Sequence, residues 1–314
     1  MKKVLIVISE NNKGKFISKG FSAAFRNLSY FVYDMKIYDL NSDLINQLKP
    51  DIVFIFWSDI TDKLLVEKTF QKINVNPDFI HCAEYREDIP EIFQKQKSGN
   101  IFYSEAEKKK NKYVQPVSAI DYKTSFEGYK YNITFAGNPS YQNREIILSE
   151  LIKNFGIINI FSRSYDFYKS LEDITNKNLL NEYETELYKK SYKGYVDSSK
   201  ELADIYVSSK INIDMQNQKI KEFNYRLLEI TASGAFIIAP YSNSVIKQYD
   251  DGKEIETYKD IYELVDKTEF YLKNAGLAQL IALNGKKNTL SNFSYEDKLK
   301  NMLKVVYGKD FSSR

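Results

Sequence analysis

The sequence predicts an α/β protein built from parallel β-sheets and crossover helices. Short apolar runs alternate with segments of helical periodicity from the N-terminus onward, which is typical of parallel strands joined by helices. The run Asp51–Phe56 is apolar at almost every position, as expected for a strand buried on both faces. At 314 residues the chain is long enough for one large or two medium domains with proper hydrophobic cores.

The composition is that of a globular protein, with 43% hydrophobic and 15% aromatic residues. A net charge of +3 is too small and too evenly spread to indicate nucleic-acid binding, although a mildly basic face could help at an anionic membrane surface. The single cysteine, Cys82, excludes an internal disulfide and fits a reducing compartment. The apolar run Val4–Ile8 is too short for a signal peptide, and no stretch approaches a membrane span, so we expect a cytoplasmic protein.

The first 120 or so residues are predicted to form one strand–helix domain. The expected strands are Val4–Ile8, Tyr30–Ile37, Asp51–Phe56, Phe79–Cys82 and Ile101–Tyr103. The expected helices are Phe16–Leu28, a short helix from Ser42, Thr61–Ile73, Ile89–Gln96 and Ser104–Asn111.

Three polar residues of this domain are candidates for a catalytic or acceptor-binding role. Asp59 follows the strand Asp51–Phe56, His81 is the only histidine and lies at the end of Phe79–Cys82, and Glu84 follows three residues later. Open α/β sheets bind ligands beyond the carboxyl ends of their strands, which is where these residues lie. The alternative is a structural histidine with ordinary surface carboxylates.

The second half repeats the strand–helix pattern after a polar stretch, Ser118–Lys130, without clear periodicity. We place the first domain at residues 1–120, a linker at 121–130, the second domain at 131–293 and a terminal helix at 294–314. The expected strands are Tyr131–Ala136, Gly156–Phe161, Ile211–Met215 and Ala235–Ala239. Helices are expected from Tyr141, after the capping box of Ser198 and Glu201, before Gly234, and from Asp260 to about Lys273. Lys169–Lys190 receives no assignment.

The stretch Lys221–Pro240 contains the strongest functional signal. A short helix with a buried stripe, ended by Gly234, leads into an apolar strand stopped by Pro240. Arg226 and Glu229 are three residues apart near the start of this helix, so both side chains project from the same side, close to the end that attracts anions. A guanidinium suits phosphate oxygens and a carboxylate can accept from two vicinal hydroxyls, so the pair would suit a nucleotide diphosphate and its ribose. The alternative is an ion pair on a solvated face.

Other residues near the ends of second-domain strands could contribute to the same site. Gly137 and Asn138 form the turn after Tyr131–Ala136, where backbone N–H groups could approach a phosphate, or where an ordinary turn could lie. Arg144 and Arg163 each follow a predicted strand and could reach a diphosphate, unless they are simply solvated.

The run R-x-x-E-x-x-A-x-G-x-F, which starts at Arg226, resembles the signature of group 1 glycosyltransferases, in the branch similar to spore-maturation protein CgeB. Further segments agree in order, beginning at Ile133, Tyr192 and Gly252, so the resemblance covers roughly Tyr131–Asn288. It implies the GT-B fold, in which two Rossmann-like domains face each other and a last helix crosses back to the first domain. It also implies sugar transfer from a nucleotide donor.

The resemblance assigns roles to individual residues. Glu229 matches the glutamate that holds the donor ribose, and Tyr192–Val196 resembles the segment that faces the base, where Tyr195 would stack unless it packs in the core. Many members have a second glutamate eight residues before the first, for recognition of the donor hexose. That position is Lys221 here, with Glu222 beside it.

Several other enzyme classes lack their motifs in this sequence. It contains no Asp-x-Asp triplet, no His–Cys cluster for zinc, no Walker loop and no Gly-x-Gly-x-x-Gly after a strand. These absences are consistent with a metal-independent enzyme without a cofactor. Together with the resemblance, which implies glycosyl transfer, they lead us to expect a retaining glycosyltransferase whose co-substrate is a UDP-type nucleotide sugar. The expected partners are a glycan, lipid-linked or protein acceptor and a peripheral membrane contact. The alternatives are a GT-B nucleotide-sugar epimerase and a non-catalytic nucleotide-sugar-binding module.

Overall fold

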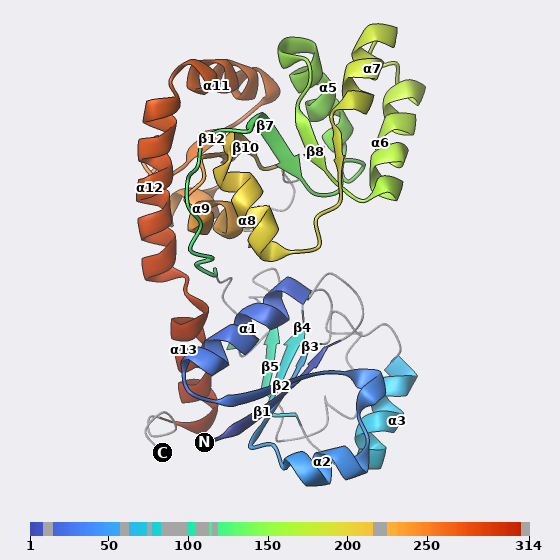
Figure 1. The fold of residues 1–314 in the computed structure, drawn as a ribbon, viewed down its shortest axis with the longest axis vertical. Helices are drawn as coiled ribbons and strands as arrows, with labels where there is room; N and C mark the ends of the chain where they lie inside the picture. Colours follow the sequence, from blue (N-terminus) through green and yellow to red (C-terminus); the bar gives the residue numbers. More distant parts are fainter. Residues whose placement is uncertain are drawn as a thin grey trace. The chain divides into compact units, whose positions relative to one another are not determined.

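The computed structural model describes residues 1–8, 15–56, 63–73, 77–82, 100–103, 113–114, 119–215 and 225–308. The chain forms two compact units (Figure 1). The first unit comprises Met1–Ser118 with Phe293–Arg314, and the second is the continuous segment Ala119–Asn292. Within the described ranges, no helix is both long and apolar enough to cross a membrane.

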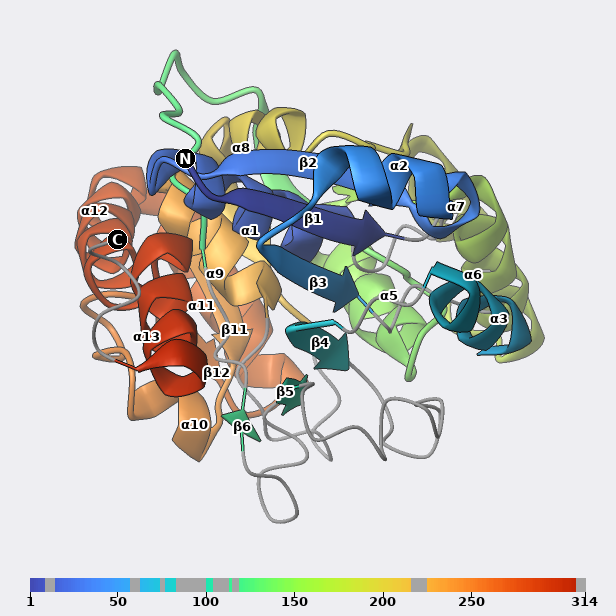
Figure 2. The same cartoon turned by 90° about the horizontal axis from the view of Figure 1, so that it is seen from below.

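The first unit contains a six-stranded parallel sheet in the order β2-β1-β3-β4-β5-β6, which can be followed in Figure 2. Its strands are β1 (Lys3–Ile8), β2 (Phe31–Lys36), β3 (Ile52–Phe56), β4 (Phe79–Cys82), β5 (Asn100–Tyr103) and β6 (Tyr113–Val114). Every residue of β3 is buried, as predicted for a central parallel strand.

The described helices of this unit are α1 (Lys15–Asn27), α2 (Ser42–Leu48), α3 (Lys63–Ile73) and the last helix, α13 (Tyr295–Tyr307), with a short 3-10 helix, η1 (Ile37–Asp39). α13 packs against α1: the rings of Phe21 and Tyr295 meet edge to face at 5.0 Å, and Asn27 Nδ2 donates to Glu296 Oε1 at 2.5 Å. A side chain at Gly20 would overlap the Tyr295 ring, so the absence of a Cβ allows this close contact.

The second unit contains another six-stranded parallel sheet, in the order β12-β11-β10-β7-β8-β9. Its strands are β7 (Tyr131–Ala136), β8 (Asn159–Phe161), β9 (Tyr192–Gly194), β10 (Ser209–Ile213), β11 (Ile237–Pro240) and β12 (Glu256–Tyr258). The chain starts in the middle of the sheet at β7, runs outward to β9, and returns to β10 on the other side of β7. This is the Rossmann strand order, and the direction reverses between β7 and β10.

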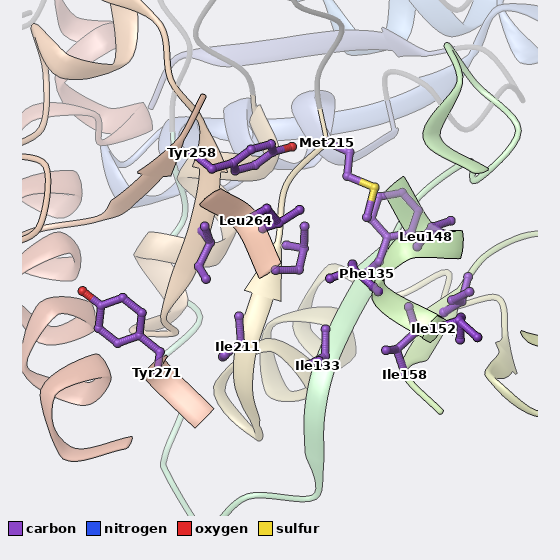
Figure 3. Packing of buried hydrophobic residues seen from close by; sticks show 14 of the residues in the cluster. Ile133, Phe135, Leu148, Ile152, Ile158, Ile211, Met215, Tyr258, Leu264 and Tyr271 are labelled. Atoms are coloured by element: carbon purple, nitrogen blue, oxygen red, sulfur yellow. The ribbon is translucent and has the colours of Figure 1, made fainter. Parts of the chain in front are cut away.

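Helices cover this second sheet and enclose its core. They are α5 (Arg144–Phe155), α6 (Ser164–Asn176), α7 (Glu182–Lys190), α8 (Ser199–Val207), α9 (Tyr225–Ser233), α10 (Asn243–Ile246), α11 (Ile261–Lys273) and α12 (Ala275–Asn292). Ile133 of β7 and Ile211 of β10 lie next to each other in the core, with Leu148 of α5 and Leu264 of α11 packing around the strands (Figure 3). Apolar positions on strands and helices thus meet in one cluster.

Several helix ends and strand bounds can be compared with the sequence-based expectations. Ser198 caps α8 by accepting from Glu201 N at 3.3 Å, and Asp260 caps α11 by accepting from Glu263 N at 2.9 Å, so both predicted N-caps are confirmed. In α11 the Glu263 carboxylate accepts from Lys259 N at 2.8 Å and not from the cap residue, which differs from the predicted capping box. The strand expected at Ile211–Met215 is β10, which runs two residues earlier. The helices expected at Ile89–Gln96 and Ser104–Asn111 lie outside the described residues. The sequence did not predict β6, β9, β12, α6, α7, α10 or α12.

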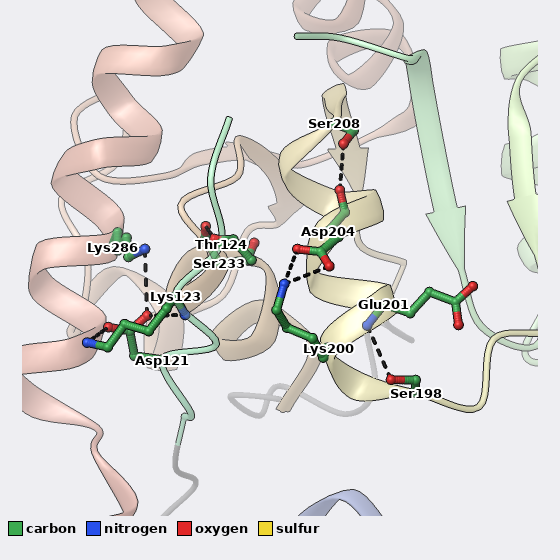
Figure 4. Close-up of polar contacts among 10 residues, drawn as sticks. All are labelled: Asp121, Lys123, Thr124, Ser198, Lys200, Glu201, Asp204, Ser208, Ser233 and Lys286. Atoms are coloured by element: carbon green, nitrogen blue, oxygen red, sulfur yellow. Dashed lines mark hydrogen bonds and ion pairs between the residues drawn. The ribbon is translucent and has the colours of Figure 1, made fainter. Parts of the chain in front are cut away.

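Residues 120–130, within the stretch expected to be a linker, contain no helix or strand and are bound to the second unit. Thr124 Oγ1 donates to the carbonyl oxygen of Ser233 at 2.5 Å, and Lys286 Nζ lies 3.7 Å from Asp121 Oδ1 (Figure 4). Through these two contacts the segment binds both the C-terminal end of α9 and the side of α12.

Candidate functional site

The candidate site lies where the strand order of the second sheet reverses. Gly137 directly follows β7, and Asp214 and Met215 directly follow β10, the neighbouring parallel strand. α9 carries Arg226 and Glu229. Since ligands of open α/β sheets bind at the carboxyl ends of the strands beside such a reversal, the site has the position expected of a nucleotide site.

Arg226 is held at this point by contacts on three sides. Its Nη1 lies 3.7 Å from Oδ1 of the buried Asp214, and its Cζ lies 5.7 Å from the ring centre of Phe135. A Cβ at position 137 would be only 2.7 Å from Nη2, so the guanidinium occupies the space that Gly137 leaves free. Its side chain is 25% exposed and its ion pair is with Asp214, so the alternative of an intrahelical pair on a solvated face is wrong for Arg226.

Arg144, the first residue of α5, approaches the same aromatic ring. Its Cζ also lies 5.7 Å from the Phe135 ring centre, its Nε donates to Met215 O at 2.8 Å, and its Nη1 donates to Asn138 O at 3.0 Å. Burial, together with the charge of Arg226, lowers the pKa of Arg144 to about 10, so it remains a cation at neutral pH. Asp214 forms an ion pair with Arg226, and its negative charge partly offsets the lowering of the pKa of Arg144. The site therefore has an excess of positive charge suited to a diphosphate.

Glu229 lies one turn further along α9 in a half-buried environment. Burial raises its pKa to about 7, an effect that the charge of Arg226 partly offsets. Burial also raises the pKa values of Tyr206 and Tyr225, and the negative charge of Glu229 raises them further, so both hydroxyls lie within electrostatic reach of this carboxylate. A carboxylate in such a partly desolvated environment can accept strong hydrogen bonds from ligand hydroxyls.

The turn after β7 differs in detail from its expected role. The N–H of Gly137 donates to Phe161 O at 2.9 Å, so it is already engaged in the sheet. Asn138 Nδ2 donates to Asp166 Oδ1, and Asn138 Oδ1 accepts from the backbone N and the hydroxyl of Ser140, each at 2.9 Å. Gly137 thus contributes space for Arg226, and Asn138 stabilises the turn and offers its carbonyl oxygen to Arg144.

Arg163 and Tyr195 form a second pair, beyond the carboxyl ends of β8 and β9. The Arg163 Cζ lies 5.4 Å from the Tyr195 ring centre, and Tyr195 is 44% exposed. The alternative that Tyr195 packs in the core is therefore wrong. An exposed ring stacked on a guanidinium offers a flat surface that could accommodate a base.

Of the remaining sequence-predicted residues, only His81 lies within the described part of the chain. His81 lies in β4, where its backbone is in register with Phe56 of β3 and Phe102 of β5. Asp59, Glu84, Lys221 and Glu222 lie outside the described residues.

Sequence reasoning missed Asp214, the counterion of Arg226. The expected strand Ile211–Met215 included this position, whereas β10 ends at Ile213 and puts Asp214 at the carboxyl edge. A polar residue after an apolar strand was the signal that could have identified it.

A family model described as glycosyl transferase-like matches residues 144–304, which is 161 of the 314 residues and more than half of the chain. The chain therefore belongs to this glycosyl transferase-like family, and the expectation of a glycosyltransferase is confirmed. No curated protein matches the chain in sequence.

Solved structures share the fold at low sequence identity. A glycosyltransferase from Rickettsia africae has a TM-score of 0.59 at 12% identity, with 97% of each chain covered. Sucrose-phosphate synthase from Thermosynechococcus elongatus has a TM-score of 0.62 at 9% identity, covering 97% of this chain and 98% of that one. Anabaena HepE in complex with UDP-glucose has a TM-score of 0.53 at 10% identity, covering 98% and 100%. These neighbours confirm the GT-B class of α/β fold with parallel sheets, whereas the CgeB-like branch stays a prediction.

Proposed function

We propose that this protein transfers a sugar from a UDP-type nucleotide donor to a glycan, lipid-linked or protein-linked acceptor, within the CgeB-like branch of its family. The observation that carries the proposal is the pair of guanidiniums, Arg144 and Arg226, which both lie against the ring of Phe135 where the strand order reverses. Arg226 is ion-paired with Asp214, and Glu229 follows it by three residues on α9. A nucleoside diphosphate carries both an anionic group for guanidiniums and ribose hydroxyls for a carboxylate acceptor, so it fits this combination of side chains.

In this proposal each group of the second unit binds one part of the donor. Arg144 and Arg226 neutralise the diphosphate, Glu229 accepts from the ribose hydroxyls, and Tyr195 stacks on the base with Arg163 nearby. Lys221 and Glu222 stand where relatives recognise the donor hexose. The donor thus belongs to the second unit and the acceptor to the first, where His81, Asp59 and Glu84 are the candidate contacts.

The proposed reaction is metal-independent and retains the configuration of the transferred sugar. The charge that develops on the leaving diphosphate is stabilised by the two guanidiniums, which are fixed before the donor arrives. The leaving phosphate oxygen takes the proton of the acceptor hydroxyl, so no protein nucleophile is required. Two structural neighbours support the choice of donor: HepE was solved with UDP-glucose, and an alpha-glucosyltransferase with a TM-score of 0.62 was solved with UDP and DNA.

The test is UDP release from a panel of UDP-sugars with candidate acceptors. We expect release that depends on an acceptor, persists in excess chelator, and is lost in Glu229→Ala while the variant stays folded by circular dichroism. The anomeric configuration of the product, read by NMR, tests retention. Interconversion of UDP-sugars without an acceptor would indicate an epimerase, and tight binding without turnover across the panel would indicate a binding module.

A further inference from the structure

The second unit contains a cavity at the opposite edge of its sheet from the candidate site. The cavity has a volume of about 140 Å³, and its wall includes Ser209, the first residue of β10, with Ala235 and Phe236, which precede β11. It therefore lies at the amino ends of these strands, whereas Arg144 and Arg226 lie at the carboxyl ends of β7 and β10. The two sites occupy opposite edges of one sheet.

Most of the cavity wall is apolar. The rings of Phe126 and Tyr129 meet edge to face at 4.8 Å, and Phe236 and Leu283 also line the cavity. An apolar cavity of roughly 150 Å³ can hold one benzene molecule, so this cavity has room for a single six-membered ring. Aromatic and aliphatic walls favour the faces of an apolar ring.

The serine and threonine hydroxyls of the cavity wall already donate within the protein. Thr124 Oγ1 donates to Ser233 O at 2.5 Å, and Ser233 Oγ donates to Ile230 O at 2.6 Å. Ser209 Oγ donates to Ile205 O at 2.7 Å. These protons are therefore not available to a ligand. A sugar would lose water at its hydroxyl groups without gaining enough partners here, so the cavity suits a less polar ligand.

Lys286 carries the only charge among the described residues that line the cavity. Its side chain is 24% exposed, and its stem packs over the turn after α9, where a Cβ at Gly234 would lie 3.1 Å from Cδ. Its Nζ lies 3.7 Å from Asp121 Oδ1, but Lys123 already donates to both oxygens of that carboxylate, at 3.0 Å and 2.6 Å (Figure 4). No residue that the structure describes accepts a hydrogen bond from Lys286 Nζ. This ammonium can therefore donate to an anionic ligand.

We propose that the cavity binds a small organic acid that has one six-membered apolar ring, with its carboxylate on Lys286. The ring contacts the apolar wall, and the carboxylate supplies the acceptor that the ammonium lacks. A phosphate fits less well, because its greater charge and three acceptor oxygens need more donors than one ammonium provides. The proposal does not depend on the donor role of the other edge of the sheet.

Titration of the full chain with three small compounds, followed by ligand-observed NMR, tests this proposal. Benzoate has both the ring and the carboxylate, benzyl alcohol has the ring without the charge, and acetate has the charge without the ring. We expect saturable binding of benzoate, and weaker binding of the other two. Equal affinities for benzoate and acetate would show that the ring does not enter the cavity, and no saturable binding of benzoate would overturn the proposal.

A pair of lysine variants on α12 identifies the cation. Lys286→Met keeps an apolar stem over Gly234 and removes the charge, so it should lower benzoate affinity about tenfold and leave that for benzyl alcohol nearly unchanged. Lys287→Met is the matched control, because Lys287 is exposed and does not line the cavity. If both variants change benzoate affinity alike, Lys286 does not hold the carboxylate and the proposal is wrong.

A third variant separates this cavity from the candidate donor site, whose guanidiniums could also bind a carboxylate. Arg226→Gln should keep the benzoate affinity of the wild type, even though it is expected to weaken the binding of UDP. Loss of benzoate binding in Arg226→Gln would assign the carboxylate to the donor site and overturn the proposal. Failure of UDP to bind any of these proteins would count against the donor site alone.

Discussion

At the scale of single residues, the site depends on a missing side chain. Gly137 has φ 152° and leaves the space in which the Arg226 guanidinium lies, against the backbone that follows β7. Arg144 approaches from the start of α5, and Asp214 balances part of the combined charge. The proposed anion site is therefore formed before a ligand binds, which would lower the entropy that binding must offset.

Gly137→Ala tests this close packing. The added methyl would lie 2.7 Å from Arg226 Nη2, so the guanidinium has to move, and we expect UDP affinity to fall about 10–100-fold by calorimetry. Gly128→Ala is the matched control, because Gly128 also has positive φ, 114°, but nothing lies within 4 Å of its added Cβ. That variant should lose some stability and keep its UDP affinity. Equal UDP affinities in the two variants would contradict the assigned role of Gly137.

From the raised pKa of Glu229 we predict that folding stability and UDP affinity depend on pH with opposite sign. Its pKa is raised from 4.5 to about 7, so its contribution to folding stability is fully present below pH 4.5 and is lost as the pH rises through 7. Glu229→Gln should therefore be more stable than the wild type above pH 7, by about 2 kcal/mol after allowance for solvent screening, and the gain should vanish towards pH 4.5. Urea unfolding at a series of pH values measures this, with the exposed Glu201→Gln as control. A gain in stability independent of pH would refute the raised pKa.

Ligand binding should change in the other direction. Only the ionised carboxylate offers full acceptor capacity to the ribose hydroxyls, so UDP affinity should fall as the pH drops from 8 to 6. In Glu229→Gln this pH dependence should be much weaker. Calorimetric titrations at pH 6, 7 and 8 in the same ionic strength compare the two proteins, and a wild-type affinity that rises towards pH 6 would be inconsistent with the role proposed for Glu229.

Sequence reasoning identified Arg226, Glu229 and Arg144 because their positions relative to strands and helix starts are visible along the chain. It could not identify what surrounds them. Asp214 and Tyr206 reach the site from other elements, and whether Tyr195 is buried or exposed depends on packing that no local pattern reports. The sequence thus indicated which side chains could form the site, but not their pKa values or their partners.

At the scale of elements, a buried hydroxyl cluster positions α9. Thr289 Oγ1 of α12 donates to Thr231 Oγ1 of α9 at 2.7 Å, and the Tyr249 hydroxyl lies 2.6 Å from Thr289 Oγ1. Thr231 in turn donates to Leu227 O within α9, at 2.8 Å. Since α9 carries Arg226 and Glu229, the packing of α12 on α9 supports the candidate site from behind.

Two glycines of α12 provide a matched test of that packing. Gly285→Ala would force a methyl against the Glu254 carbonyl oxygen, and we expect it to destabilise the second unit by about 1–3 kcal/mol. Gly276→Ala places its methyl in open space on the same helix and should be neutral or stabilising by up to about 1 kcal/mol. Thermal unfolding of both variants would contradict the packing argument if they shifted the melting temperature alike.

The elements that were predicted have strong local signals, and those that were missed do not. α8 and α11 are each preceded by an N-cap residue, Ser198 and Asp260, that can be recognised in the sequence. α12 has apolar residues on both sides and a glycine in its interior, so its helical periodicity is hidden. β12 is three residues long, which is too short for a period of two to be recognised.

At the scale of the whole molecule, each unit has its own sheet and its own core. The second unit is one continuous segment, Ala119–Asn292, whereas the first is completed by the returning helix α13. The alternation of strands and helices predicts that both sheets are parallel, but the sequence alone does not say on which side each new strand is added, so it does not give the strand orders.

This division predicts that residues 119–292 fold alone and bind UDP. All the described residues that form the candidate site lie within this segment, so its UDP affinity should match that of the full chain within about threefold, as measured by calorimetry. The segment should show no sugar transfer, because the proposed acceptor contacts lie in the first unit. A folded segment that does not bind UDP would mean that the first unit contributes to donor binding.

The most direct test of the account is a calorimetric comparison of UDP, UMP and uridine with the wild type, Arg226→Gln and Arg226→Lys. The wild type should bind UDP more tightly than UMP, and UMP more tightly than uridine, because each phosphate adds contacts with the guanidiniums. Arg226→Gln should lose most of the difference between UDP and UMP, Arg226→Lys should be intermediate, and Arg26→Gln in the first unit should match the wild type. Equal affinities for UDP in the wild type and in Arg226→Gln, or no binding of any nucleoside diphosphate, would contradict the proposed diphosphate site.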